Sequence, residues 1–455
     1  MTPISQKGRA KARLSDGLAF AVAVSGIFYM TGSLVVTLTP SGASSSGKVQ
    51  ALGAAFGLWS MIGLWARPGA LNRIVMLYWP ALLAPGLAVA SLLWTVDPAL
   101  SLRRAGALML TTAFALWLVE RFPARVLWQI LATALAVTVL ASLATVFLRP
   151  QIGIHQAYDA LGEQAAHAGD WRGLYFHKND FGRMMAYCFM LSCVLLVARP
   201  RWRWSMGPIA VLALLGVAGS TSGQAAFLSV LMPALLLFGL ALRRASARGR
   251  AMLVVIAVPV TLFFALVWQV LFATVLELLG KDPTLTGRTE IWGGVLAALR
   301  GNLALGGGFG AGWDIVGDKL FALTAISVGH AHNGFLDLMT DLGVVGLGLL
   351  LGLMGWLLLV GLRDFFGAKD PMLGLLAVAV SLFALVGNWA ASFLLLHNSL
   401  YWVLPVVLIA HLRRRYCPWG HIVQPVAPFS RSSMSLLVPH MPRSPKAGRF
   451  PPLAP

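Results

Sequence analysis

The chain has 455 residues, of which 58% are hydrophobic and only 11% are charged, and its mean hydropathy is +0.78. Soluble domains carry roughly 25% charged residues, so this composition excludes a soluble protein and predicts that lipid surrounds most of the chain. The net charge of +19 does not indicate a nucleic-acid partner, because Lys and Arg recur in short clusters at alternate gaps between apolar segments and form no single basic face.

Twelve apolar segments are each long enough to cross a bilayer, which needs about 20 residues. We expect them near residues 16–38, 50–66, 74–94, 104–119, 125–147, 182–198, 206–220, 224–242, 251–276, 342–362, 371–392 and 397–412. The first segment is longer than the apolar part of a signal peptide and is expected to stay as an anchor. The basic residues Lys7 to Arg13 before it, together with the even number of spans, place both termini in the cytoplasm.

Acidic residues concentrate on the side opposite the termini. In this topology that side holds twelve of the sixteen, namely Asp97, Asp159, Glu163, Asp170, Asp180, Glu277, Asp282, Glu290, Asp314, Asp318, Asp337 and Asp341. It also has the two long loops, at about 148–181 and 277–333. Loops of this length are usually functional or disordered, and these contain His, Arg, Asn, Trp and Gly in no simple repeat. We therefore expect the active site on this side.

The chain divides into three parts. Residues 1–15 form a cytoplasmic N-terminus, 16–415 a membrane domain, and 416–455 a tail rich in Pro, Ser and Arg. The tail has no hydrophobic period and is expected to be disordered. The three cysteines show no metal-binding spacing, so neither a metal nor a cofactor is expected.

The first motif on the outer side is W-T-V-D-P-A-L-S-L-R-R at 94–104. Asp97-Pro98 indicates the start of a helix, because Pro is favoured at the first helical position. Arg103 and Arg104 contradict the positive-inside rule. Either they form an anion site at a helix end, or they are interfacial arginines on a capped helix.

The second motif, W-R-G-L-Y-F-H-K-N-D-F-G-R at 171–183, places cations among aromatic residues. Aromatic rings suit the faces of sugars, and Arg and Lys suit phosphate oxygens. The candidate substrate-binding residues are Arg172, His177, Lys178 and Asn179. The alternative is an interfacial aromatic belt with snorkelling cations.

The third motif opens with T-G-R-T-E-I-W at 286–292. Thr286 is a plausible N-cap, and the apolar residues that follow at helical spacing predict an amphipathic helix along the membrane surface. Arg288 falls in its first turn, where it could hold a phosphate together with free backbone N–H groups. The alternative is an ion pair between Arg288 and Glu290 or Asp282.

A glycine cluster follows at Gly306, Gly307, Gly308, Gly310 and Gly312. It lacks the Lys-Ser/Thr of a nucleotide-binding loop and is not preceded by a strand. We expect these glycines to form a tight turn and to let the backbone approach a bulky ligand.

The fourth motif is G-H-A-H-N-G-F-L-D-L at 329–338. The spacing of His330 and His332 is poor for joint zinc ligation. A histidine at the mouth of an apolar helix suits a general base, and the adjacent Asn333 suits substrate binding. The alternative is a structural histidine. His397-Asn398 in the last outer loop is a weaker version of the same pattern.

These four motifs, in this order over about residues 90–350, resemble the O-antigen ligase/polymerase family of bacterial envelope proteins, and within it the exopolysaccharide-polymerase branch. The resemblance implies an all-helical inner-membrane protein with a large periplasmic loop. It further implies a metal-independent, inverting glycosyltransferase that joins a glycan from an undecaprenyl-pyrophosphate carrier to an acceptor sugar hydroxyl. The acceptor is a glycan or glycolipid, and polysaccharide-export and chain-length proteins are expected partners.

By the same resemblance, His332 or His330 deprotonates or positions the acceptor, and Arg288 holds the donor pyrophosphate. Arg103 and Arg104 add to the phosphate site. One departure concerns Ser220-Thr221-Ser222-Gly223, where the family usually has a Ser-Arg or Ser-Lys pair and this chain has no cation.

Three functions compete at this point. Polymerisation of lipid-linked repeat units comes first, and ligation of a finished glycan to lipid A core second. The third is a transporter or flippase without catalysis, for which mid-membrane polar residues and repeated halves are expected and are not found in the sequence.

Overall fold

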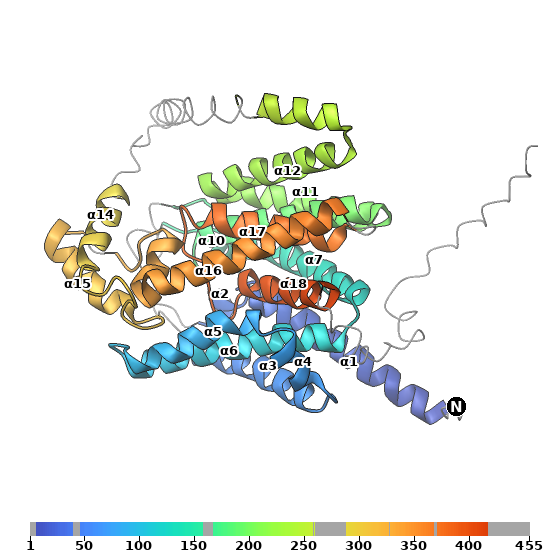
Figure 1. Ribbon diagram of the computed structural model, residues 1–455, viewed down its shortest axis with the longest axis horizontal. Helices are drawn as coiled ribbons and strands as arrows, with labels where there is room; N and C mark the ends of the chain where they lie inside the picture. Colours follow the sequence, from blue (N-terminus) through green and yellow to red (C-terminus); the bar gives the residue numbers. More distant parts are fainter. Residues whose placement is uncertain are drawn as a thin grey trace, which may run out of the picture.

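The computed structural model describes residues 6–39, 46–157, 167–257, 259, 288–326, 328–367 and 371–416. All the secondary-structure elements named in these ranges are helices (Figure 1). The predicted all-α fold is confirmed. In chain order the helices are α1 (Gln6–Met30), α2 (Val35–Leu38), α3 (Gly47–Trp65), α4 (Ala70–Met76), α5 (Pro80–Ala90), η1 (Ser91–Leu93), α6 (Pro98–Arg121), α7 (Ala124–Leu148), α8 (Pro150–Gly153), α10 (Lys178–Ala198), η2 (Pro200–Trp202), α11 (Arg203–Ser220), α12 (Gly223–Arg244), α14 (Arg288–Ala298), α15 (Gly312–Thr324), α16 (Gly334–Gly367), α17 (Met372–Gly387) and α18 (Leu400–Tyr416).

Six helices in the described ranges (α6, α7, α10, α11, α12 and α16) are long and apolar enough to cross a membrane, and α3 with α4 adds a seventh if this pair, bent by 102°, is one span. The segment expected at 74–94 is divided, because α4 ends at Met76 and α5 begins at Pro80. The span expected at 251–276 lies largely outside the described residues, as does the tail from 417 onwards. The count of twelve stays a prediction.

Helix α10 lies at the centre of the bundle, where it packs against α7, α11, α12 and α17. Its Tyr187 ring lies 4.7 Å from the Phe383 ring of α17 and 4.9 Å from the Tyr401 ring of α18, measured between centroids. All three rings belong to one continuous apolar core. Burying such rings removes apolar surface from water or lipid and fixes how the helices cross.

Glu120, near the end of α6, is fully buried and joins several basic residues. Its carboxylate accepts hydrogen bonds from Arg73 (Nη2 at 2.6 Å), from the Tyr78 hydroxyl at 2.8 Å and from Arg414. A buried carboxylate is stable only when its charge is balanced and hydrogen-bonded, and these partners meet both needs. The basic clusters that the sequence assigned to topology alone therefore also hold α4, α6 and α18 together.

Helices α14 and α15 lie at the end of the bundle opposite the start of α1 (Figure 1). They pack on each other and on the beginning of α16 around a small apolar cluster of their own, which includes Val295, Val316, Leu320 and Ala331. This cluster fixes the histidine motif at 329–334 to the two short helices. The described part of the second long loop, from Arg288 onwards, is thus folded onto the bundle and positions the residues that its sequence motifs contain.

Candidate active site

The loop that carries the two histidines is held tightly against the start of α16. The Gly334 N–H lies 2.9 Å from the Asn388 carbonyl oxygen and 2.8 Å from that of Ala391, so the loop is anchored on the segment after α17. Asn333 accepts hydrogen bonds at its Oδ1 from the N–H groups of Phe335 and Leu336. Asn333, proposed from the sequence as a substrate ligand, thus caps α16.

The two histidine rings meet edge to face, with centroids 4.0 Å apart. His332 has a left-handed backbone (φ 52°), and its N–H donates to Nδ1 of His330 at 3.1 Å. A neutral His330 therefore carries its proton on Nε2 and offers a donor. The imidazole of His332 has no hydrogen bond to another described residue, so it is the ring with a lone pair available.

The glycine cluster lies against α16 at the point where that helix is interrupted. The N–H groups of Gly307 and Gly308 donate to the carbonyls of Thr340 and Asp341 at 2.8 and 2.9 Å, and α16 breaks at Gly343 (φ 64°). A Cβ at Gly312 or Gly343 would collide with backbone atoms of Thr340 and Ala304 respectively. The close approach expected for a ligand is thus made by the protein's own backbone.

Helix α6 begins as the sequence predicts, with Asp97 accepting the Leu100 N–H at 3.0 Å. Arg104, in its second turn, donates from Nη1 to the Gly310 carbonyl at 2.5 Å. Its remaining guanidinium N–H groups have no hydrogen bond to a described residue. The glycine loop therefore fixes the direction of Arg104 while leaving donors free.

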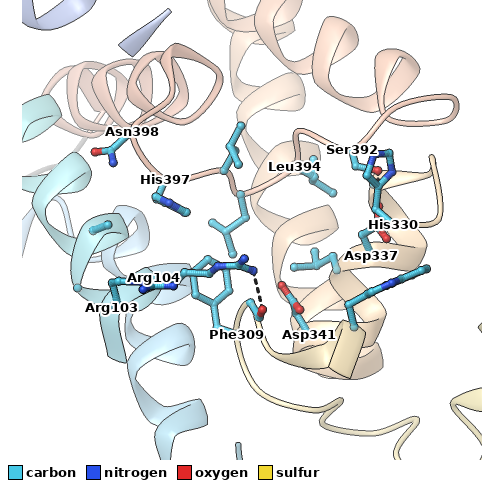
Figure 2. A pocket seen from close by; sticks show the side chains of 18 of the residues that line it. Arg103, Arg104, Phe309, His330, Asp337, Asp341, Ser392, Leu394, His397 and Asn398 are labelled. Atoms are coloured by element: carbon cyan, nitrogen blue, oxygen red, sulfur yellow. Dashed lines mark hydrogen bonds between the residues drawn. The ribbon is translucent and has the colours of Figure 1, made fainter. Parts of the chain in front are cut away.

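A cavity of about 740 Å³ lies between these elements. Its walls come from α3, α6, the loop at 309–313, the histidine loop, the first part of α16 and the segment at 392–398. Figure 2 shows Arg103 and Arg104 with His397 on one side and His330 beside Ser392 on the other. The polar lining thus combines two arginines, two histidines and the carboxylates of α16, namely Asp337 and Asp341.

Several contacts fix the Asp337 carboxylate beside the histidine loop. It accepts the Ala331 N–H at 2.8 Å and the Ser392 hydroxyl. The Asp341 carboxylate accepts the Gly312 N–H at 3.1 Å, and Figure 2 shows Arg104 pointing toward it. Both aspartates are half-buried and engaged, so they orient the cavity wall.

The electrostatics of the site favour a neutral His332. Burial, followed by the charges of His330, Arg288 and His177, lowers the pKa of His332 to about 4. Burial also lowers the pKa of Arg288, which is half-buried at the first residue of α14. Arg288 and His177, which were predicted as substrate ligands, are therefore close enough to His332 to affect its charge. Thr286, the expected N-cap, lies outside the described residues.

The other residues of the motif at 171–183 serve mainly to hold the outer loop on the bundle. Arg172 donates from Nε to the Ile152 carbonyl at 2.9 Å. Lys178 donates from Nζ to Asp170 at 2.6 Å and to the Thr221 hydroxyl at 3.1 Å. These side chains do not line the cavity. Lys178 thus places a positive charge beside Thr221, in the segment 220–223 where the family usually has a cation and this sequence has none.

His177 and Asn179 form the start of α10. His177 is its N-cap, and its Nδ1 accepts the Asn179 N–H at 3.1 Å. Burial lowers the pKa of His177, against the opposing effect of Asp180. Asn179 is exposed in the first turn. Neither residue lines the cavity, and His177 reaches the site only through its effect on His332.

The sequence did not single out three cavity residues as ligands, namely Asp337, Asp341 and Ser392, and it marked His397 only as a weaker version of the histidine pattern. Asp337 belongs to the histidine motif and Asp341 follows it four residues later on α16, which was a usable signal. Ser392 and His397 lie more than fifty residues further along the chain, and only the packing of α17 and α18 brings them to the cavity.

An all-α bundle with a polar cavity at one end defines a polytopic membrane protein with a site for a charged ligand. The family model described as O-antigen ligase matches residues 208–351, which include Arg288, His330 and His332. This match confirms the resemblance and supports assignment of the chain to the O-antigen ligase/polymerase family. A comparison with curated proteins gives no match. The matched segment is less than half of the chain, and it shows similarity to the O-antigen ligase family over α11, α12, α14, α15 and the first part of α16.

Proposed function

We propose that the protein is an inner-membrane glycosyltransferase that polymerises exopolysaccharide or O-antigen repeat units from an undecaprenyl-pyrophosphate carrier. The observation that carries this proposal is that one cavity is lined by Arg103 and Arg104 on one side and by His330 on the other. A diphosphate leaving group needs cations, and an acceptor hydroxyl needs a base. The cavity supplies the arginines, and His332, which does not itself line the cavity, lies against the lining ring of His330 with the two centroids 4.0 Å apart.

In this proposal the donor diphosphate binds at the arginines of α6. Arg104 keeps one nitrogen on the Gly310 carbonyl, so its other donors can meet phosphate oxygens as a fixed fork. Arg288 adds positive charge on the side of His332. Because these cations are already oriented, they stabilise the charge that develops as the sugar–phosphate bond breaks, without reorganisation.

The acceptor sugar approaches from the histidine loop. His332 is the proposed base, because its imidazole is neutral and has no hydrogen bond to another described residue. Its ring takes the hydroxyl proton while the acceptor oxygen bonds to the anomeric carbon and the phosphate oxygen leaves with its electron pair. Attack opposite the leaving group inverts the anomeric configuration. His330 donates from Nε2 and positions the acceptor.

A helical bundle suits this reaction because the polyprenyl tail of the donor stays in the bilayer while its diphosphate meets the cavity. Apolar side chains are exposed on α3 and α16, the helices beside the cavity, as lipid-facing helices require. We place the cavity on the periplasmic side and both termini in the cytoplasm, because Arg73, Arg121 and Arg414 form ion pairs with Glu120 and Asp16 at the end of α6 that lies away from the cavity.

Complementation tests the assignment of this site. A strain that lacks the protein would be supplied with the His332→Ala or Arg104→Ala variant, and with Arg300→Ala as a matched control, since Arg300 is exposed after α14. Loss of long glycan in the first two, at normal membrane levels and with an active control, supports the proposal. Full activity of both variants would overturn the site.

Ligation of a finished glycan to an acceptor such as lipid A core is the second candidate, because the matched family model is described as O-antigen ligase. The two functions leave different intermediates in a strain without the protein. Loss of a polymerase accumulates single carrier-linked repeat units, whereas loss of a ligase accumulates long carrier-linked chains. Size analysis of the lipid-linked glycans separates them.

A further inference from the structure

His397 is a cavity residue that the reaction described above does not use. It lies between α17 and α18, and Figure 2 shows it on the same side of the cavity as Arg103 and Arg104. In the described part of the chain its imidazole has neither a hydrogen bond nor an ion pair. A polar ring that lines a cavity without a protein partner is available to a ligand.

The backbone around His397 is held in an unfavourable conformation. Leu395 has a left-handed φ of 56°, which residues with a Cβ rarely adopt, and Asn398, whose side chain tolerates this region, has a φ of 50°. The Asn398 N–H donates to the Thr111 hydroxyl of α6 at 2.8 Å, which helps to keep this turn in place. Such strain persists only where the surroundings enforce it, and here it fixes the position of His397 relative to α6.

The charge around His397 changes its protonation in a defined direction. Burial, followed by the positive charges of Arg104 and Arg103, lowers the pKa of His397 to about 4. The imidazole is therefore neutral in the empty cavity near neutral pH. An anion bound to the same arginines would cancel their repulsion and attract a proton to the ring.

We propose that His397 is a third cationic ligand of a diphosphate held by Arg103 and Arg104, and that it takes up its proton when this anion enters the cavity. The inference rests on the proposed function, because that function supplies the diphosphate. A protonated imidazole gives a charge-assisted hydrogen bond to a phosphate oxygen. This bond strengthens as negative charge grows on the leaving group, so His397 would both improve binding of the diphosphate and assist its departure from the sugar.

Other charged and titratable groups share the cavity and must be separated from His397 in a test. They come from α6, the histidine loop and α16, and they are Arg103, Arg104, His330, Asp337 and Asp341. Gln50, the polar lining residue of α3, does not titrate. The Asp341 carboxyl also titrates close to neutral pH, because burial raises its pKa to about 7, so Asp341→Asn is the matched control beside His330→Gln.

The test measures proton uptake when a diphosphate diester binds. The probe is a synthetic geranyl glucosyl diphosphate, whose two ionised oxygens do not titrate near neutral pH. It is titrated calorimetrically into the full-length protein in lipid nanodiscs, in buffers of different ionisation enthalpy. The wild-type protein should take up about one proton per bound diester near pH 6, and its affinity should fall as pH rises through the bound-state pKa. His397→Gln should abolish the uptake, remove this pH dependence and weaken binding about tenfold.

Each outcome has one consequence. Wild-type binding without proton uptake overturns the inference, whether or not the variant folds. Uptake that is lost in Asp341→Asn or His330→Gln but kept in His397→Gln overturns it as well. If Arg104→Gln weakens binding while His397→Gln changes nothing, only the inference fails. If Arg104→Gln leaves binding unchanged, the proposed donor site itself fails.

Discussion

The main-chain N–H of His332 donates to Nδ1 of His330 at 3.1 Å. The two histidines of this motif therefore differ in which ring nitrogens remain available for a ligand. His330 offers an Nε2 donor, and His332 offers a lone pair. The left-handed backbone of His332 (φ 52°) makes this contact possible by bringing the two rings to 4.0 Å. The symmetrical sequence His-Ala-His therefore folds into an asymmetric pair.

This asymmetry predicts unequal effects of two substitutions. His332→Gln removes the proposed base and should lower the rate of glycan transfer by about 10²–10⁴-fold, the usual contribution of a general base. His330→Gln keeps a donor of similar reach and should lower the rate by about tenfold or less, the cost of one hydrogen bond. Initial rates with lipid-linked donor, at matched protein levels in nanodiscs, check this. Equal loss in both variants would contradict the division of roles.

Arg288 should control the pH dependence of the reaction through His332. The pKa of His332 is lowered first by burial and also by the charges of His330, Arg288 and His177. Removing one positive charge raises that pKa, so His332 becomes protonated at a higher pH. In Arg288→Gln the acidic limb of the rate profile should move to higher pH, toward the ordinary histidine value of about 6.5.

The control for this shift is Arg300→Gln, because Arg300 is an exposed arginine just beyond the end of the same helix. Its profile should match that of the wild-type protein. An acidic limb that stays in place in Arg288→Gln would show that Arg288 does not act on the base, even if the overall rate falls.

The beginnings of elements near the site could be predicted from local sequence. Asp97-Pro98 predicted the start of α6, and the apolar spacing after Arg288 predicted α14, because capping and periodicity act over a few residues. The contacts that make the site act over the whole chain. His397 reaches Arg104 only after α17 and α18 have packed, and no local pattern contains that information.

Lys178 and the glycine cluster show the same limit in another way. Both were interpreted as ligand contacts because cations and glycines often meet phosphates. In the folded protein Lys178 binds Asp170, and Gly307 binds the Thr340 carbonyl beside the break in α16. In both cases the polar group has a partner within the protein, and the motif alone does not reveal that partner.

The break in α16 predicts a strong difference between two glycines of that helix. Gly343 has φ 64° and no room for a Cβ next to the Ala304 carbonyl, whereas Gly352 has open space. Gly343→Ala should destabilise the protein by about 1–3 kcal/mol or more, since it adds steric collision to an unfavourable conformation. Gly352→Ala should leave the melting temperature in detergent unchanged or slightly raised. Equal melting temperatures of the two variants would mean that the break is not required.

The Lys178–Asp170 pair predicts a structural effect with a defined pH dependence. Burial raises the pKa of Asp170, but hydrogen bonds from Lys178 and Thr221 outweigh it, and the net pKa is lowered. A carboxylate with a lowered folded-state pKa stabilises the protein above its unfolded value of about 3.9, and this stability is lost as pH falls through the folded value. Wild-type stability should therefore drop steeply in that acidic range.

Lys178→Met removes the main partner and should reduce stability at neutral pH by about 1–3 kcal/mol, because Asp170 keeps a partly buried charge that is less well paired. The double variant with Asp170→Asn should recover part of this loss, since no unpaired charge remains. Thermal unfolding of the four proteins at neutral and acidic pH completes the cycle. If Lys178→Met is as stable as the wild-type protein but binds the diphosphate diester more weakly, Lys178 is a substrate ligand, as the sequence first indicated, and the structural assignment is wrong.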